Sequence, residues 1–164
     1  EKILLASSIN DEALILSKAP VPIKKLLDHI LDQHEKSHQF VNNIDEDIII
    51  NGDEFYLISL FQNLIENAKK YSEKLTSITF TGKKINENVI ISIADEGIGI
   101  KDEFKQKIYE RFFRIGDEET RSTKGTGLGL FLVKEIVKLH GAQISCKDNL
   151  PRGTIFDIRF SSIS

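Results

Sequence analysis

Three stretches of the chain carry apolar residues every three or four positions, which is the spacing of one face of an α-helix. They predict helices over residues 23–35, 53–71 and 126–140. In the longest stretch Leu57, Leu60 and Leu64 share one face, and Asp53 precedes it at a position typical of a helix N-cap. This long middle helix is the element around which we expect the chain to fold.

Apolar and polar residues alternate in six short segments, as in strands with one buried face. These segments are residues 39–43, 48–51, 77–84, 88–94, 142–147 and 154–160. The acidic residues 45–47 join the first two, residues 85–87 suggest a hairpin, and residues 151–153 suggest a turn. The order of elements predicts an α+β fold, a two-layer α/β sandwich. Its mixed, mostly antiparallel sheet is covered on one face by three helices.

Residues 101–124 break both patterns. They are polar, with a short helical piece expected over residues 104–113 and few apolar residues after Phe113. Phe112 and Phe113 are candidates to pin this segment to the body of the domain. Without a ligand to order it, the remainder is expected to be a mobile lid.

A polar stripe borders the apolar face of the long helix. Asn63, Asn67, Lys70 and Tyr71 follow one another at helical spacing. Asparagine forms helices poorly, because its side chain competes for backbone hydrogen bonds. Its amide oxygen can ligate Mg²⁺ without adding charge, and a lysine one turn on can neutralise a phosphate. The alternative is a solvated helix face with two incidental asparagines.

The sequence DEGIGI follows a predicted strand directly. A carboxylate at a strand end can lie at the floor of a pocket, and Gly97 and Gly99 would let a flat ring approach the backbone. Ionised Asp95 only accepts hydrogen bonds, so it would pair with the exocyclic amine of adenine and repel the carbonyl of guanine. The alternative is a glycine-rich turn with a capping aspartate.

The sequence GTGLGL, residues 125–130, precedes the last predicted helix. Glycine-rich backbone at a helix N-terminus offers free N–H groups and a positive dipole, which suit phosphates. The spacing matches neither a P-loop nor a dinucleotide-binding loop. The alternative is a flexible hinge. Arg114, with Arg121 and Lys124 as further candidates, could reach a terminal phosphate.

Composition narrows the class of protein. A chain of 164 residues fits one domain, and its net charge of −3 argues against a nucleic-acid partner. Cys146 is the single cysteine, so an internal disulfide is impossible. The sequence has no apolar run of transmembrane length and no recognisable signal peptide, and it starts without a methionine, so we interpret it as a fragment.

The four motifs, in this order, resemble the boxes of a known family. NLIENAKKY, DEGIGI, IYERFFR and GTGLGL are similar to the N, G1, F and G2 boxes of the ATP-binding domain of sensor histidine kinases, in the GHKL or Bergerat-fold family. The resemblance covers residues 19–160. It implies that residues 1–18, otherwise read as an ordinary N-terminal helix ended by Pro20 and Pro22, are the tail of a dimerisation and phosphoacceptor helix. Residues 19–164 would be the catalytic domain, with a lid at about residues 101–124.

The resemblance also implies roles for individual residues. Asn67 would ligate Mg²⁺, and the catalytic candidates are Asn63, Lys70 and Arg114. The implied nucleotide-binding residues are Asn67, Lys70, Tyr71, Asp95, Gly97, Gly99, Ile100, Arg114, Lys124, Gly125, Thr126, Gly127, Leu128, Gly129 and Leu130. The implied cofactors are ATP or ADP with Mg²⁺.

Two departures refine this expectation. Relatives that hydrolyse ATP carry a glutamate where this chain has Asn63, so phosphoryl transfer is favoured over hydrolysis. None of the four histidines has the sequence context of a phosphoacceptor, so the chain resembles the donor half only. Its implied partners are its own dimerisation domain and the receiver domain of a response regulator.

We further expect a monomeric fragment of a homodimeric parent. The domain would be cytoplasmic, which leaves open an anchor of the parent in the bacterial inner membrane. Two other functions stay open: a degenerate nucleotide-binding scaffold without kinase output, and a serine kinase of the anti-sigma-factor type.

Overall fold

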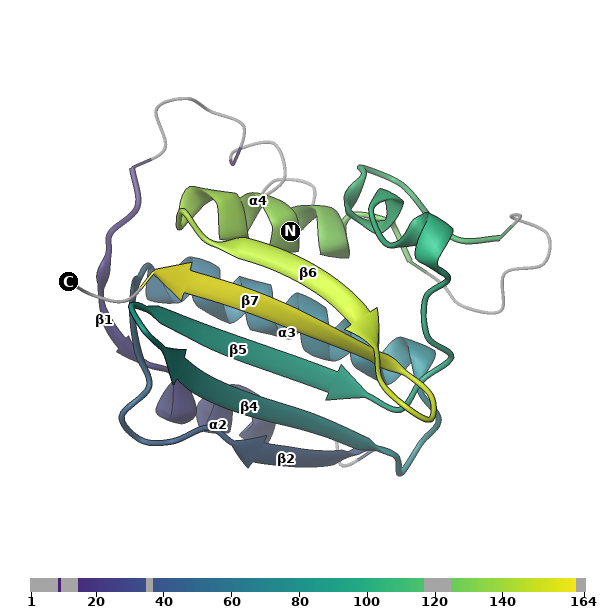
Figure 1. Ribbon diagram of the computed structural model, residues 1–164, viewed down its shortest axis with the longest axis horizontal. Coiled ribbons are helices and arrows are strands. Elements are labelled where there is room, and N and C mark those ends of the chain that lie inside the picture. The colour runs from purple at the N-terminus through teal and green to yellow at the C-terminus, as the bar shows by residue number, and fades with distance from the viewer. Residues whose placement is uncertain (1–8, 10–14, 35–36, 117–124, 162–164) are drawn as a thin grey trace.

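The computed structural model describes residues 9, 15–34, 37–116 and 125–161. In chain order (Figure 1) the elements are β1 (Ala19–Pro22), α2 (Ile23–Asp32), β2 (Gln39–Asn43), β3 (Ile49–Gly52), α3 (Glu54–Tyr71), β4 (Ser77–Ile85), β5 (Asn88–Asp95), η1 (Asp102–Phe104), η2 (Lys107–Tyr109), α4 (Gly129–Leu139), β6 (Gln143–Asp148) and β7 (Thr154–Ser161).

Five strands form one sheet in the order β2-β4-β5-β7-β6. The β2–β4 pair is parallel, and the other three pairs are antiparallel. Helices α2, α3 and α4 lie on the same side of this sheet (Figure 1). The predicted α+β sandwich with a mixed, mostly antiparallel sheet is therefore confirmed.

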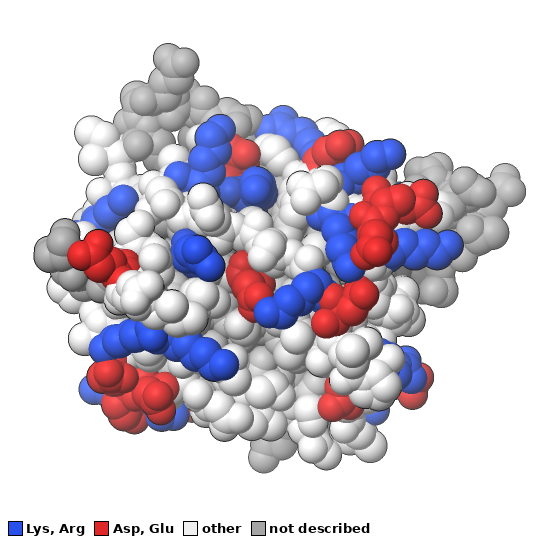
Figure 2. Space-filling view, viewed as in Figure 1, with Lys and Arg blue, Asp and Glu red and all other residues white. Residues whose placement is uncertain are grey.

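The opposite face of the sheet carries no helix of the described residues and is polar. Figure 2 shows acidic and basic side chains interspersed on this face. Ser92 and Lys147 both donate hydrogen bonds to the carboxylate of Asp157, which links β5, β7 and β6 across the surface. One apolar and one polar face is the pattern that period-two alternation predicts for an antiparallel sheet.

The core lies between the sheet and α3. Leu57, Leu60 and Phe61 of this helix are fully buried, as are Phe80 and Ile91 of the sheet. Asp53 caps the helix, because its side chain accepts a hydrogen bond from the N–H of Phe55 at 3.1 Å. The predicted N-cap and apolar face are confirmed, and they fix which side of α3 borders the sheet.

Strand β1 was not predicted. It pairs with β3 in a separate two-stranded sheet, with Ala19 opposite Gly52. Prolines are tolerated there because an edge strand needs few of its N–H groups. Strands β2 and β3 follow one another in the chain but belong to different sheets. Residues 45–47 therefore connect the two sheets and do not form the turn of a hairpin.

Helix α4 begins three residues later than predicted. Gly127 has a φ of +71°, which an α-helix cannot contain, and the helix starts at Gly129. Its buried residues Leu132, Val133 and Ile136 extend the core beside α3. The delayed start leaves residues 125–128 outside the helix, at the end of α4 that faces the site.

The helix expected over residues 104–113 is replaced by the two 3₁₀ turns η1 and η2. Phe112 has a φ of +63°, which ends helical geometry at that point. Phe113 packs against the core and against Phe104, but the side chain of Phe112 is 64% exposed. The expectation that both phenylalanines pin this segment is therefore correct for Phe113 and wrong for Phe112.

The predicted N-terminal helix does not extend to residue 18, because residues 15–18 have no regular secondary structure. Ile9 lies in a turn and is buried in the core. The N–H of Ser17 donates a hydrogen bond to Asp53 at 2.8 Å, which ties this segment to the start of α3. The rest of residues 1–18, like the lid residues 117–124, lies outside the described residues.

Candidate nucleotide site

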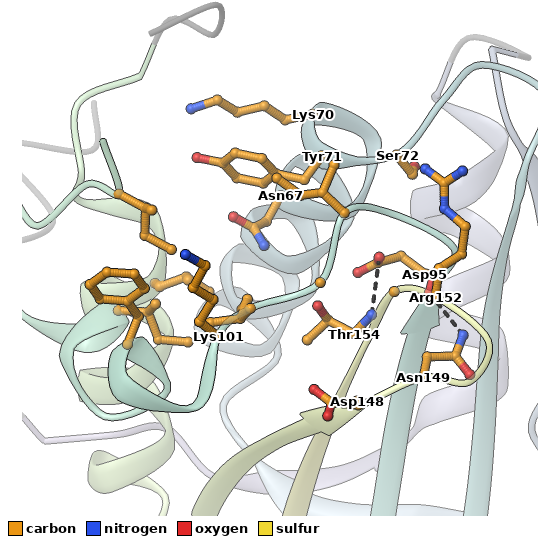
Figure 3. A pocket seen from close by; sticks show the side chains of 18 of the residues that line it. Asn67, Lys70, Tyr71, Ser72, Asp95, Lys101, Asp148, Asn149, Arg152 and Thr154 are labelled. Carbon is orange, nitrogen blue, oxygen red and sulfur yellow. Dashed lines mark hydrogen bonds between the residues drawn. The ribbon is translucent and has the colours of Figure 1, made fainter. Parts of the chain in front are cut away.

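A cavity of about 900 Å³ lies where α3 and β5 end (Figure 3). It is lined by Asn67, Lys70, Tyr71, Asp95, Gly99, Ile100, Lys101, Phe113, Arg114, Leu130, Asn149, Arg152 and Thr154, among others. A cavity of about 170 Å³ adjoins it, shares Asn67 and Arg114, and adds Asn63 and residues 125–127. The structure thus brings the four motifs around one continuous space.

Asp95 is held at the floor of the larger cavity by backbone groups. It is the last residue of β5, and its side chain is 4% exposed. Oδ1 accepts hydrogen bonds from the N–H of Gly97 at 2.8 Å and of Thr154 at 3.3 Å. Oδ2 receives no hydrogen bond from the described residues, so it is available to a ligand. This geometry leaves one fixed acceptor facing the cavity.

Burial raises the pKa of Asp95, and the hydrogen bonds from Gly97 and Thr154 act in the opposite direction. A buried carboxylate is costly unless a donor pairs with it. An exocyclic amine supplies such a donor, whereas a ring carbonyl facing Oδ2 would be repelled. The site can therefore distinguish adenine from guanine by charge and hydrogen bonding.

The backbone packs closely around this carboxylate. A Cβ on Gly97 would lie 2.4 Å from the carbonyl oxygen of Tyr71 and 2.7 Å from Oδ1 of Asp95. A Cβ on Gly153 would lie 1.9 Å from the carbonyl oxygen of Asp95. Any side chain at either position would displace the floor of the cavity, so these glycines shape the site by close approach.

The turn between β6 and β7 contributes a wall that the motif analysis missed. Asn149 donates from Nδ2 to the carbonyl oxygen of Asp95 at 2.8 Å (Figure 3). Arg152 donates from Nε to the carbonyl oxygen of Gly97 at 3.4 Å and pairs with Glu73 at 3.3 Å. These residues are about 55 positions from Asp95 in the chain, and no local spacing could have indicated them. The turn residues 151–153 were the only signal.

The opposite part of the site has a cationic border. Figure 3 shows Asn67, Lys70 and Tyr71 projecting from the end of α3. Lys70 Nζ lies 4.9 Å from the ring centre of Tyr71, and a Cβ on Gly125 would lie 2.5 Å from the same nitrogen. The ammonium group therefore lies against the glycine-rich loop, where it can neutralise a phosphate bound to that backbone.

Two asparagines of α3, Asn63 and Asn67, line the smaller cavity. Asn63 is 5% exposed, and its Nδ2 donates to the carbonyl oxygen of Ser59 at 2.8 Å. Its buried Oδ1 has no hydrogen-bond partner among the described residues and would lie 3.3 Å from a Cβ on Gly129. An unpaired buried acceptor is costly, so this oxygen fits a cation or donor brought by a ligand. Amide oxygens are suitable ligands for Mg²⁺.

Most of the remaining predicted residues line one or both cavities. Thr126, Gly127, Gly129 and Leu130 line the smaller cavity, and Gly99, Ile100 and Arg114 line the larger one. Leu128 is 2% exposed and lines neither cavity. Lys124 lies outside the described residues.

The described part of the chain contains no cluster of three or more histidine, cysteine, aspartate or glutamate residues that could hold a metal ion. Among the same residues, no helix has the length and apolar character needed to cross a membrane.

Comparison with known proteins agrees with this geometry. Residues 52–162 match the family described as "Histidine kinase-, DNA gyrase B-, and HSP90-like ATPase". Sensor protein CiaH of Streptococcus pneumoniae serotype 4 is 36% identical over 132 residues, which make up 80% of this chain and 29% of CiaH. Curated relatives are thus much longer, and this chain spans 23% of Bacillus subtilis WalK.

Solved structures of histidine kinases also share this fold. Full-length ShkA, in a complex with AMPPNP, matches with a TM-score of 0.82 and 26% identity over 99% of this chain and 35% of ShkA. The mycobacterial sensor histidine kinase MprB matches with a TM-score of 0.77 and 26% identity over 88% of this chain and 97% of that structure.

The fold and site define an ATP-binding domain of the GHKL type. The chain belongs to the histidine kinase-, DNA gyrase B- and HSP90-like ATPase family, and the relatives named above are sensor proteins and sensor histidine kinases. The scaffold and anti-sigma-factor alternatives are not favoured, because the relatives are named sensor kinases.

Proposed function

We propose that this domain binds Mg-ATP and donates the γ-phosphate to a histidine of its dimerisation domain. A new N–P bond forms at that histidine as the bond between the γ-phosphorus and the β–γ bridging oxygen breaks, and ADP leaves. The phosphoryl group would then pass to an aspartate of a response-regulator receiver domain. The observation that carries the proposal is the buried, backbone-held carboxylate of Asp95, which lies in the same cavity as Lys70 and Arg114.

Each side chain has a distinct role in this proposal. Asp95 accepts a hydrogen bond from the exocyclic amine of adenine, and the loop at residues 125–129 binds phosphate through its N–H groups. Lys70 and Arg114 place positive charge at the β- and γ-phosphates. Asn67 and the unpaired oxygen of Asn63 would hold Mg²⁺, which supplies charge neutralisation when it is bound.

The same residues favour transfer over hydrolysis. A general base for water must be able to accept a proton, and the amide of Asn63 cannot do so. Two of the chain's four histidines are poorly placed as acceptors, because His38 is buried and both ring nitrogens of His140 are hydrogen-bonded. None of the four has the sequence context of a phosphoacceptor. We therefore propose that the acceptor histidine lies outside these 164 residues. We also propose that the domain works in the cytoplasm, where ATP is available. The isolated chain is proposed to be monomeric.

Calorimetric titration of ATP and GTP, with and without Mg²⁺, tests this function. Asp95→Asn should abolish most ATP binding, because the amide presents a donor or a weaker acceptor to the adenine amine. The variant is expected to fold, since an amide oxygen can still accept from Gly97 and Thr154. Glu96→Gln, which alters the exposed neighbouring carboxylate, is the matched control.

The outcomes separate the alternatives. We expect ATP to bind more tightly than GTP, to bind better with Mg²⁺, and to bind equally to Glu96→Gln. Binding that is indifferent to Asp95, or no binding by the wild-type chain, would contradict the proposal and return the domain to the scaffold interpretation.

A further inference from the structure

One residue outside the nucleotide cavity connects two of its walls. Residues 101–116, which we call the aromatic segment, form one wall, and the turn between β6 and β7 forms another. Lys105 lies in the aromatic segment directly after η1 but does not line the cavity. Its Nζ lies 2.5 Å from Oδ1 of Asp102 and 2.9 Å from Oδ1 of Asp148. Asp148, in contrast, lines the cavity at the end of β6.

This ion pair is better covered than an ordinary surface pair. The side chain of Lys105 is 17% exposed, although those of Asp102 and Asp148 are 90% and 60% exposed. The two carboxylates raise the pKa of Lys105, so the ammonium stays charged throughout the neutral range. Asp102 belongs to the same turn as Lys105, whereas Asp148 is on another element. Only the second contact therefore joins two walls of the site.

The backbone of Lys105 makes a second contact with the same strand. The thiol of Cys146 points to the carbonyl oxygen of Lys105 at 3.7 Å. Cys146 and Asp148 are two residues apart on β6 and therefore face the same side of the sheet. Lys147, between them, instead pairs with Asp157 on the other face. One side of β6 thus contacts both the side chain and the backbone of Lys105.

We propose that Lys105 is a positioning residue, which fixes the aromatic segment against β6 through Asp148 and so sets the width of the nucleotide cavity. Lys101 and Arg114 lie in the aromatic segment, and Asp95 is bonded to the turn that follows Asp148. When the ion pair between Lys105 and Asp148 is intact, Lys101 and Arg114 on one side of the cavity keep a constant distance from Asp95 on the other. This inference rests on the proposed function and adds a determinant of affinity to the same site.

The test compares ATP binding by Lys105→Met and Asp148→Asn with that of the wild-type chain. Each should raise the Kd for ATP by about two- to fivefold, the range expected for a partly exposed ion pair. The double variant should be no weaker than either single variant, because both remove the same contact. Lys105→Arg should restore binding. Lys107→Met, an exposed lysine two residues away, is the matched control and should change nothing.

The single cysteine supplies an independent readout. Cys146 is half-buried against Lys105, so release of the aromatic segment should speed its reaction with a thiol reagent. We expect faster modification in Lys105→Met and Asp148→Asn, and the wild-type rate in Lys105→Arg and Lys107→Met. Equal rates and equal Kd values in all variants, or additive losses in the double variant, would overturn the inference. Failure of the wild-type chain to bind ATP would instead refute the proposed function, while the thiol rate still decides whether the pair holds the segment.

Discussion

At the scale of single residues, the site depends on backbone contacts around one carboxylate. Asp95 is bonded to Gly97 in its own segment and to Asn149 and Thr154 at the turn between β6 and β7, so two distant segments meet at it. Gly153 permits this approach, because its φ of +116° and its missing Cβ leave room for the carbonyl oxygen of Asp95. The position of the Asp95 carboxylate thus depends on the backbone and side-chain contacts that surround it.

Alanine at two glycines separates backbone strain from collision. Gly141 also has a positive φ, of +65°, but an added Cβ there would meet no atom within 4 Å. Gly141→Ala should cost about 1–2 kcal/mol, the usual strain of left-handed backbone. Gly153→Ala should lower the free energy of unfolding by roughly 3 kcal/mol or more, because the collision with Asp95 adds to the strain. Urea denaturation measures both, and equal losses would contradict this reading of Gly153.

At the scale of elements, α3 and α4 join at the end opposite the site. His140, which ends α4, accepts a hydrogen bond at Nε2 from the N–H of Asp53 at 3.1 Å. Its Nδ1 must then carry the proton, which it donates to the carbonyl oxygen of Ile136 at 2.8 Å. The side chain of Asp53 also binds Ser17. The neutral imidazole thus holds together the two helices that carry the nucleotide motifs.

This junction predicts a pH dependence of stability. Burial, aided by the charge of Lys18, lowers the pKa of His140, against the opposing effects of Ile136 and Asp53. The unfolded chain therefore takes up the proton first as the pH falls, so the free energy of unfolding should decrease below the ordinary histidine pKa of about 6.5. At pH values above this ordinary pKa, His140 is neutral in both the folded and the unfolded chain, so its titration does not change the free energy of unfolding.

Urea denaturation at about pH 7.5 and about pH 5.5, which bracket the ordinary histidine pKa, measures the effect. His140→Gln should lose less stability over this interval than the wild-type chain. Some loss should remain, because burial also lowers the pKa of His34. His29→Gln, on the exposed side of α2, is the control. An unchanged pH dependence in His140→Gln would contradict the assignment.

At the scale of the whole molecule, the cavity connects the ends of α3 and β5, the aromatic segment, the start of α4 and the turn before β7. A ligand in this space contacts elements from most of the chain. Its binding free energy should therefore add to the free energy of unfolding of the whole domain.

Mg-ATP at about 100 times its Kd should stabilise the folded chain by about 2.7 kcal/mol. For a domain of this size the melting temperature should rise by roughly 5–10 °C. Differential scanning calorimetry measures the shift, and Asp95→Asn at the same concentration should show little of it. An equal shift in that variant would mean that ATP binds elsewhere.

Local pattern and chemistry by themselves determined the three helices, the strands of the large sheet, the N-cap at Asp53 and the four motifs of the site. These features depend on residues within a few positions of one another, so period and composition are enough to reveal them. Strand β1, the delayed start of α4 and the irregular residues 104–113 were not foreseen. Strand β1 depends on its partner β3. The start of α4 and the irregular segment depend on left-handed backbone at Gly127 and Phe112, respectively.

Only the tertiary structure decided which distant residues complete the site. Asn149, Arg152 and Thr154 reach Asp95 and Gly97 because β7 pairs with β5. Asp148, the partner of Lys105, lies on β6, the edge strand of the five-stranded sheet. The tertiary structure also showed that Leu128 is buried and lines neither cavity. The physical reason is that hydrogen bonds and ion pairs depend on distance in space, and strand pairing sets that distance independently of separation along the chain.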